Sequence, residues 1–258
     1  MESRVARPVR VYSDLPHASS SLGRLLALRA RASVRERGTF RWVLAGGHTP
    51  EPLYRLLARR YRETFPWHHT EVFFGDERCV GPHDPASNFR AAQESLLSNV
   101  PIPPRRIHRL RGELPPAQAA REYTRSIGSL GVPGASPPRF DLVLLGMGPD
   151  GHTASLFPHA PALRERKRPV VVVPRAGQPP FVPRLSLTLP ALASSREVCF
   201  LVSGEDKAKA ISSVFRSFPE GSPGFPASLV QSQGPTRWFL DKAAGRELPS
   251  TVRTAEPD

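Results

Sequence analysis

The chain has 258 residues, of which 39% are hydrophobic, and its formal net charge at pH 7 is +13. This length suffices for a large hydrophobic core, built as one sizeable α/β domain or two small ones. No apolar run approaches the roughly 18 residues that a membrane-spanning helix needs, and the amino terminus lacks the apolar segment of a signal peptide. We therefore expect no membrane association and a cytoplasmic location.

The charge and the cysteines exclude further classes of protein. Cys79 and Cys199 stand alone, outside any Cys-x-x-Cys spacing, which argues against a metal centre or a disulfide framework and favours a reducing compartment. The basic residues are scattered, without interleaved aromatics or a nucleic-acid-binding motif, so we expect no nucleic-acid partner. An ordinary solvated exterior explains the charge, and a positive field would also raise the encounter rate of a phosphorylated substrate.

Short apolar runs typical of buried strands alternate with amphipathic segments typical of helices. In chain order we predict a strand at Val9–Tyr12, a helix at Leu22–Val34, a strand at Phe40–Ala45, a helix at Pro52–Tyr61, a strand at Glu71–Phe74, helices at Phe89–Leu97 and Ala117–Ile127, strands at Phe140–Leu145, Pro169–Val173, Leu185–Leu189 and Val198–Val202, and a helix at Asp206–Phe215. This alternation predicts a doubly wound α/β fold, with a mostly parallel sheet in a three-layer α/β/α sandwich.

The domain organisation follows from the same pattern. The stretch Thr153–Pro190 departs from strict alternation and is expected to form a small lid or subdomain. We predict one α/β domain over residues 1–248 and a polar C-terminal tail over residues 249–258.

A glycine-rich turn follows the strand predicted at 40–45. In the hexapeptide Ala45-Gly-Gly-His-Thr-Pro50, Thr49 predicts an N-cap and Pro50 a first-turn proline. Gly46 and Gly47 would let N–H groups approach a phosphate at the helix N-terminus, although a plain strand-to-helix turn explains the segment equally well. The turn matches neither the Walker pattern nor Gly-x-Gly-x-x-Gly, so no nucleotide site is predicted.

Three ionisable side chains follow the next predicted strand, in Gly75-Asp-Glu-Arg78. Arg78 could form a bidentate contact with a carboxylate or phosphate, and Asp76 could accept hydrogen bonds from substrate hydroxyls. The structural alternative is an internal Glu–Arg pair that caps the sheet, with Ser87 as the N-cap of the next helix. We favour a functional role for Arg78 and a structural one for Glu77 and Ser87.

The most informative stretch runs from Asp141 to Pro158. Its apolar run breaks at Gly146-Met-Gly148, and Asp150 and His152 follow within a few positions. Open α/β sheets bind ligands at the carboxyl ends of their strands, where these side chains would lie. Because imidazole exchanges protons near neutral pH, His152 is a candidate general base.

Two distant cations complete the candidate site. Arg184 directly precedes the strand predicted at 185–189, and Lys207 follows the strand predicted at 198–202. A phosphate needs two or three donors, which cations at strand ends can supply. Alone, each is better explained as a solvated surface charge, and only the other motifs make them candidates.

Together these motifs closely resemble the 6-phosphogluconolactonase family. The resemblance is carried by Gly-Gly-x-Thr-Pro at 46–50, by Gly-Asp-Glu-Arg at 75–78 with Ser87-Asn88, and by Leu-Gly-Met-Gly-Pro-Asp-Gly-His-Thr-Ala-Ser-Leu-Phe-Pro at 145–158. Supporting matches are Arg184 with Ser186-Leu-Thr188, Gly204 with Lys207, and Trp238-Phe-Leu-Asp241 with Ala243-Ala244. The motifs run in family order from about residue 9 to residue 247, and the block at 145–158 is highly specific.

The resemblance implies hydrolysis of 6-phospho-D-glucono-1,5-lactone to 6-phosphogluconate, in the pentose phosphate pathway, by a monomer without metal or organic cofactor. It implies the fold shared with glucosamine-6-phosphate deaminases and ribose-5-phosphate isomerases. It also implies residue roles: His152 as general base, Arg78 and Lys207 as ligands of substrate or phosphate, and Gly46, Gly47 and Thr49 as part of a phosphate seat that Arg184 faces. The chain departs from the family at Ala45 and His48, where members usually carry serine, so His48 could take the place of a hydroxyl donor.

We hypothesise that neutral His152 takes a proton as water attacks C1 of the lactone and then gives it to the departing ring oxygen. Asp150 would orient the imidazole or stabilise its cation, as the carboxylate of a catalytic triad does. The sequence leaves open how the roles divide between Asp150 and Asp76, which group stabilises the oxyanion, and whether the loop at 174–183 closes over the substrate.

Two other functions compete with lactone hydrolysis. Isomerases and deaminases of 6-phosphosugars, as the resemblance implies, carry Glu-Pro where this chain has Phe157-Pro158, and an aromatic where it has Arg78. A non-catalytic sugar-phosphate sensor would append a DNA-binding domain, for which the chain has no room, and would be expected to lose His152. Both are disfavoured.

Overall fold

The computed structural model describes residues 8–128, 139–218, 220–249 and 252. It contains a parallel sheet in the order β1-β9-β8-β5-β2-β3 and an antiparallel sheet in the order β4-β7-β6. The strands are β1 Val9–Tyr12, β2 Phe40–Leu44, β3 Thr70–Phe74, β4 Asp76–Arg78, β5 Leu142–Leu145, β6 Val170–Val173, β7 Arg184–Leu187, β8 Val198–Val202 and β9 Thr236–Asp241. The predicted doubly wound, mostly parallel α/β fold is confirmed, whereas the predicted tail at 249–258 lies almost entirely outside the described residues.

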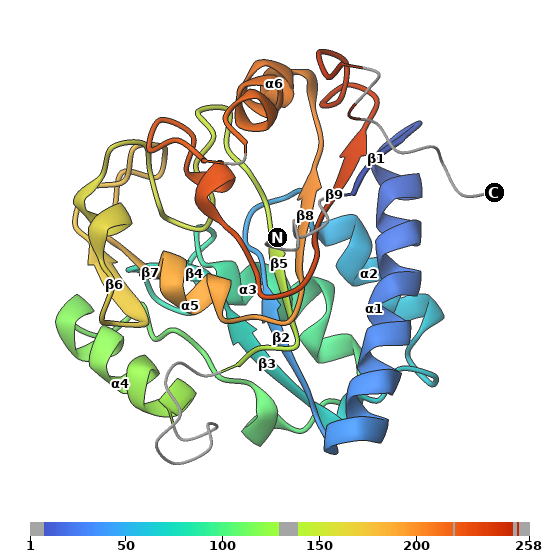
Figure 1. Cartoon of the computed structure of the whole chain (residues 1–258). Helices are drawn as coiled ribbons and strands as arrows, with labels where there is room; N and C mark the ends of the chain where they lie inside the picture. Colours follow the sequence, from blue (N-terminus) through green and yellow to red (C-terminus); the bar gives the residue numbers. More distant parts are fainter. Residues whose placement is uncertain (1–7, 129–138, 219, 250–251, 253–258) are drawn as a thin grey trace.

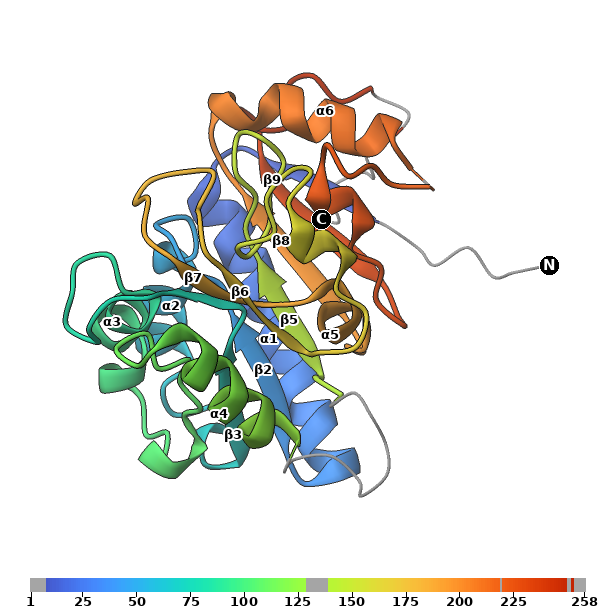
Figure 2. The same ribbon diagram turned by 90° about the vertical axis from the view of Figure 1, so that its left-hand side faces the viewer.

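Helices cover the main sheet from two sides. The α-helices are α1 Leu15–Arg37, α2 Glu51–Arg60, α3 Asn88–Ser95, α4 Pro116–Gly128, α5 Leu189–Ala193 and α6 Ala208–Arg216. The 3-10 helices are η1 Trp67–His69, η2 Leu97–Asn99, η3 Pro104–Arg106, η4 Pro161–Arg164, η5 Glu205–Lys207 and η6 Pro226–Leu229. Helices α1 and α2 lie on one side of the main sheet, and the small sheet lies with α4 and α5 on the other (Figure 1; Figure 2). Within the described ranges, no helix combines the length and the hydropathy needed to cross a membrane.

The central strands are apolar because both of their faces are covered. Every residue of β5 and of β8 is buried, which fits the near-continuous hydrophobic runs of parallel strands in α/β proteins. Helix α1 starts seven residues earlier than predicted because Asp14 caps it, accepting a hydrogen bond from the backbone N–H of His17. It ends at Gly38, which adopts a left-handed conformation with φ of 74°.

The irregular stretch at 153–190 differs from the prediction in one respect. It contributes β6 and β7 to the small sheet, but the third strand, β4, comes from Asp76–Arg78, where no strand is predicted. The strand predicted at 185–189 is also wrong at its end, because Thr188 is extended and Leu189 starts α5, with Pro190 in its first turn. The last strand of the main sheet, β9, was not predicted as a strand.

Candidate active site

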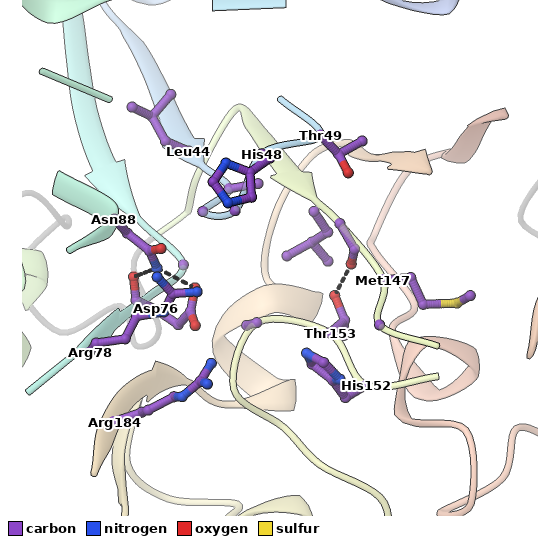
Figure 3. Close-up of a pocket in the computed structure, with 18 of the residues that line it drawn as sticks. Leu44, His48, Thr49, Asp76, Arg78, Asn88, Met147, His152, Thr153 and Arg184 are labelled. Atoms are coloured by element: carbon purple, nitrogen blue, oxygen red, sulfur yellow. Dashed lines mark hydrogen bonds between the residues drawn. The ribbon is translucent and has the colours of Figure 1, made fainter. Parts of the chain in front are cut away.

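A pocket of about 290 Å³ opens where the central parallel strands end (Figure 3). Nine of the ten site residues predicted from the sequence line it, and the tenth, Asp150, contacts the ring of His152. The lining residues are Leu44, Ala45, Gly46, Gly47, His48, Thr49, Gly75, Asp76, Arg78, Asn88, Leu145, Gly146, Met147, Gly148, His152, Thr153, Ala154, Arg184 and Lys207. The structure therefore brings the predicted residues together, while their roles remain predictions.

The imidazole of His152 is held by Asp150. Nδ1 of the ring lies 2.6 Å from Oδ1 of Asp150, and the backbone N–H of His152 donates to the same oxygen at 3.1 Å. Burial would raise the pKa of Asp150, but the hydrogen bonds and the charge of His152 outweigh burial and lower that pKa to about 2. An ionised carboxylate can only accept hydrogen bonds, so Nδ1 of the neutral His152 ring must carry the proton. Nε2 of the same ring is then free to accept a proton.

Two glycines allow the close packing of this pocket. A Cβ atom at Gly148 would lie 2.1 Å from Nδ1 of His152, and one at Gly46 would lie 2.1 Å from Oδ1 of Asn88. Neither position tolerates a side chain without displacing a residue of the pocket. Gly46 and Gly148 are therefore explained by contacts with pocket side chains.

Arg78 and Arg184 face each other across the antiparallel β4–β7 pair. The Nε atoms of both are buried without a hydrogen-bond partner, and neither guanidinium forms an ion pair with a described carboxylate. Burial lowers the pKa of Arg184, the charge of Arg78 adds to this, and Asp76 opposes it. Like charges directly opposite on two strands repel, so this pair favours an anionic ligand.

The remaining nitrogens of these arginines bind backbone carbonyls. Nη1 of Arg78 donates to the carbonyl of Ala86. Nη2 of Arg184 donates to the carbonyls of Gln178, Pro179 and Pro180 at 2.8, 3.1 and 3.2 Å. Main-chain acceptors thus orient both side chains without neutralising their charge.

Asp76 connects three segments of the site. Its Oδ1 accepts a hydrogen bond from Nδ2 of Asn88 at 3.0 Å (Figure 3). Its Oδ2 accepts one from Oγ of Ser155 at 2.6 Å. Each oxygen keeps acceptor capacity for a ligand hydroxyl. Asn88 and Ser155 have no predicted role; their only signal in the sequence is their place in the two motifs.

The glycine turn departs from its prediction at the start of α2. The N-cap is Pro50 rather than Thr49, and it forms no side-chain capping bond. The backbone N–H groups of residues 46–49 donate to no other described residue. The side chain of His48 is fully exposed at the rim, where its Nδ1 lies 2.9 Å from Oε1 of Glu51. The turn therefore offers unpaired donors beside a helix N-terminus.

Lys207 enters the pocket from η5, after β8. Its ammonium lies 2.6 Å from Oδ2 of Asp206, and its side chain is only 17% exposed. In the part of the chain that is described, no three His, Cys, Asp or Glu side chains are grouped as metal ligands would be. Lys207 thus adds a third cation to the lining of the pocket.

Glu77 and Ser87 have structural roles, as favoured. Ser87 is the N-cap of α3 and accepts a hydrogen bond from the backbone N–H of Arg90. The expected Glu–Arg ion pair is not found; instead the buried carboxylate of Glu77 accepts the backbone N–H groups of Arg78, Asn88 and Phe89. Burial raises the pKa of Glu77, and these hydrogen bonds oppose the rise. Glu77 therefore fastens β4 to the start of α3.

Comparison with known proteins identifies the family. A family model described as glucosamine-6-phosphate isomerases/6-phosphogluconolactonase matches residues 13–238. The chain belongs to this family. Its relatives in the glucosamine-6-phosphate isomerase/6-phosphogluconolactonase family include a 6-phosphogluconolactonase from Synechocystis, 42% identical over 223 residues, with 85% of this chain and 89% of the relative covered.

Solved structures of this family agree with the fold. The crystal structure of 6-phosphogluconolactonase from Thermotoga maritima is 32% identical, with a TM-score of 0.80, and covers 92% of this chain and 100% of its own. A monomeric glucosamine-6-phosphate deaminase has a TM-score of 0.77 at 22% identity, with 93% and 99% covered, and shares the fold alone. The family predicted from the motifs is confirmed.

We expect Glu77→Ala to lower the free energy of unfolding by about 2–4 kcal/mol, because it leaves three backbone N–H groups without their acceptor. Denaturant unfolding would measure this, with Glu94→Ala as the matched control on α3. Glu94 forms an exposed pair with Arg90, so its loss should cost less than about 0.5 kcal/mol. Equal losses for the two variants would contradict the role assigned to Glu77.

Proposed function

We propose that this chain hydrolyses 6-phospho-D-glucono-1,5-lactone to 6-phospho-D-gluconate, the second step of the oxidative pentose phosphate pathway. One observation carries the proposal: a single pocket holds an imidazole backed by a carboxylate and, across from it, two arginines without an ionic partner. The imidazole and its carboxylate suit proton transfer to and from water, and the two arginines suit the binding of an anionic substrate. Relatives named 6-phosphogluconolactonase that cover most of the chain support the assignment.

The reaction needs only a positioned water and a base. A lactone carbonyl is electrophilic, so water attacks C1 while Nε2 of His152 takes one of its protons. The tetrahedral intermediate then expels the ring oxygen, the C1–O bond breaks, and the imidazolium returns the proton to that oxygen. Asp150 keeps the ring oriented and stabilises its charged form, since its carboxylate is ionised.

The cations and the glycine turn bind the anionic parts of the substrate. The unpaired N–H groups of residues 46–49 and the side chains of Thr49, Lys207 and Arg184 form the phosphate seat. Arg78 contacts the substrate beside Asp76, whose free acceptor capacity suits a sugar hydroxyl. The charge of Arg78 also stabilises the oxyanion that develops at C1.

The competing functions lack a supporting contact. Phe157 lies against the ring of His152, so no carboxylate occupies the place where deaminases are expected to carry one. A catalytically inactive binder does not need the Asp150–His152 pair. A monomeric state, a cytoplasmic location and the absence of nucleic-acid or membrane partners stay predictions.

A coupled assay tests the function directly. Glucose-6-phosphate dehydrogenase generates fresh lactone from glucose 6-phosphate, and lactone loss is compared with spontaneous hydrolysis. We expect catalytic amounts of the protein to accelerate the loss. Ammonia release from glucosamine 6-phosphate, without that acceleration, would replace the proposal with deamination.

We expect His152→Asn to lower kcat by about 10²–10⁴-fold with little change in KM, because the variant loses the base but keeps the cations. Stopped-flow measurement on freshly made lactone gives both constants. Turnover close to that of the unchanged protein would remove His152 from the role of base.

Activity should fall when acid protonates the base, because an imidazolium cannot take a proton from water. Asp150 cannot cause this loss: a carboxyl whose pKa is lowered to about 2 stays ionised until the pH approaches that value. The residual activity of His152→Asn should therefore lack this acid limb. A pH profile with the same limb in both proteins would contradict the assignment.

Arg184→Met should raise KM for the lactone by about 10–100-fold and change kcat less, since it removes a charged donor that faces the anion. Arg166→Met is the matched control, because Arg166 is exposed and lies outside the pocket. Equal KM values for the two variants would show that Arg184 binds no part of the substrate.

A further inference from the structure

Phe157 lies directly behind the pocket and contacts two of the residues that line it. The residue is only 4% exposed and does not line the cavity itself. Its ring centroid lies 4.7 Å from that of His152, with the planes tilted by 40°. The guanidinium carbon of Arg184 lies 5.5 Å from the same ring centroid. A single apolar ring therefore touches both the candidate base and a candidate phosphate ligand.

The position of this ring is fixed by the residues that precede it in the chain and by a loop that packs against it. Upstream, Thr153 donates from its hydroxyl to the carbonyl of Gly146 at 2.8 Å, and Ser155 donates to Asp76 at 2.6 Å. On the outer side, a Cβ at Gly177 would lie 2.9 Å from Cδ1 of Phe157, so the loop after β6 closes against the ring. The ring is therefore closely packed and held in one position.

The two contacts have different consequences. The face that meets His152 restricts rotation of an imidazole whose only described hydrogen-bond partner for a ring nitrogen is Asp150. The face near Arg184 supplies no acceptor, so the buried Nε of that side chain stays unpaired. A carboxylate at position 157 would pair with Arg184 and compete with an anionic ligand.

We propose that Phe157 is a positioning and specificity-determining residue of this active site. It holds His152 against Asp150 in the orientation needed for proton transfer, and it keeps Arg184 available for the anionic group of the substrate. The proposal rests on the lactonase function proposed above. It separates two measurable effects, one on kcat through the base and one on substrate binding through the cation.

Two substitutions separate these effects. Phe157→Leu keeps an apolar side chain but removes the ring face, so we expect kcat to fall about tenfold while KM changes less than about twofold. Phe157→Glu adds a partner for Arg184, so KM and the Kd for 6-phosphogluconate should rise at least about tenfold above those of Phe157→Leu. Kinetics on fresh lactone and calorimetric titration with 6-phosphogluconate measure these constants.

Phe215→Leu is the matched control. Phe215 packs its ring on Trp238 with centroids 5.2 Å apart, on α6 and outside the pocket, so its loss should lower thermal stability but leave kcat and KM unchanged. If Phe157→Glu does not fold, Phe157→Gln replaces it. Its neutral carbonyl also offers Arg184 an acceptor, and we expect binding about threefold weaker than in Phe157→Leu.

The proposal is overturned if Phe157→Leu lowers kcat no more than Phe215→Leu does. It is equally overturned if the glutamate or glutamine variant binds 6-phosphogluconate as tightly as the leucine variant. Failure of the unchanged protein to accelerate lactone hydrolysis would instead overturn the proposed function. The binding measurements would then still report on the contact between position 157 and Arg184.

Discussion

The active site depends on two arginines held opposite each other on antiparallel strands, neither of which forms an ion pair with a carboxylate in the described part of the chain. The arrangement buries the charge of Arg184 and places Arg78 opposite it, and the carboxylate of Asp76 offsets part of this cost. It persists because β4 is fastened to the start of α3 by the hydrogen bonds of Glu77, and β7 also pairs with β6. The fold thus stabilises a charge arrangement that only an anion completes, which is how a binding site differs from a structural ion-pair network.

The parallel sheet supplies the other half of the site. Strands β2, β5 and β8 are neighbours or next neighbours, and they end at the same edge, so the glycine turn, the Asp150–His152 loop and Lys207 converge there. Strands β4 and β7 reach this edge from the small sheet and are not part of the main sheet. The proton-transfer pair therefore comes from the main sheet, whereas the arginine pair belongs to the small sheet, and Phe157 connects the two by packing.

The sequence predicts the parallel fold well because strands covered on both faces must be apolar throughout, as β5 and β8 are. Strand β4 was missed because its residues, Asp76 to Arg78, are charged and pair with a segment more than a hundred positions away. The same long-range pairing explains why Arg184 looked like a surface cation until the motifs were combined. Nor does local sequence show that Phe157 touches His152 and Arg184, since both contacts depend on how separate loops pack.

The loop after β6 further indicates that the site is preorganised. Residues 178–180 all accept hydrogen bonds from one nitrogen, Nη2 of Arg184, so the loop fixes the side chain through a single atom of its guanidinium. The side chain of Gln178 also approaches Asp150, with its Nε2 3.4 Å from Oδ2. The loop therefore holds both Arg184, the proposed phosphate ligand, and Asp150, the partner of the proposed base, before any substrate binds. Since substrate need not displace these bonds, binding energy is available for orienting the lactone rather than for rebuilding the loop.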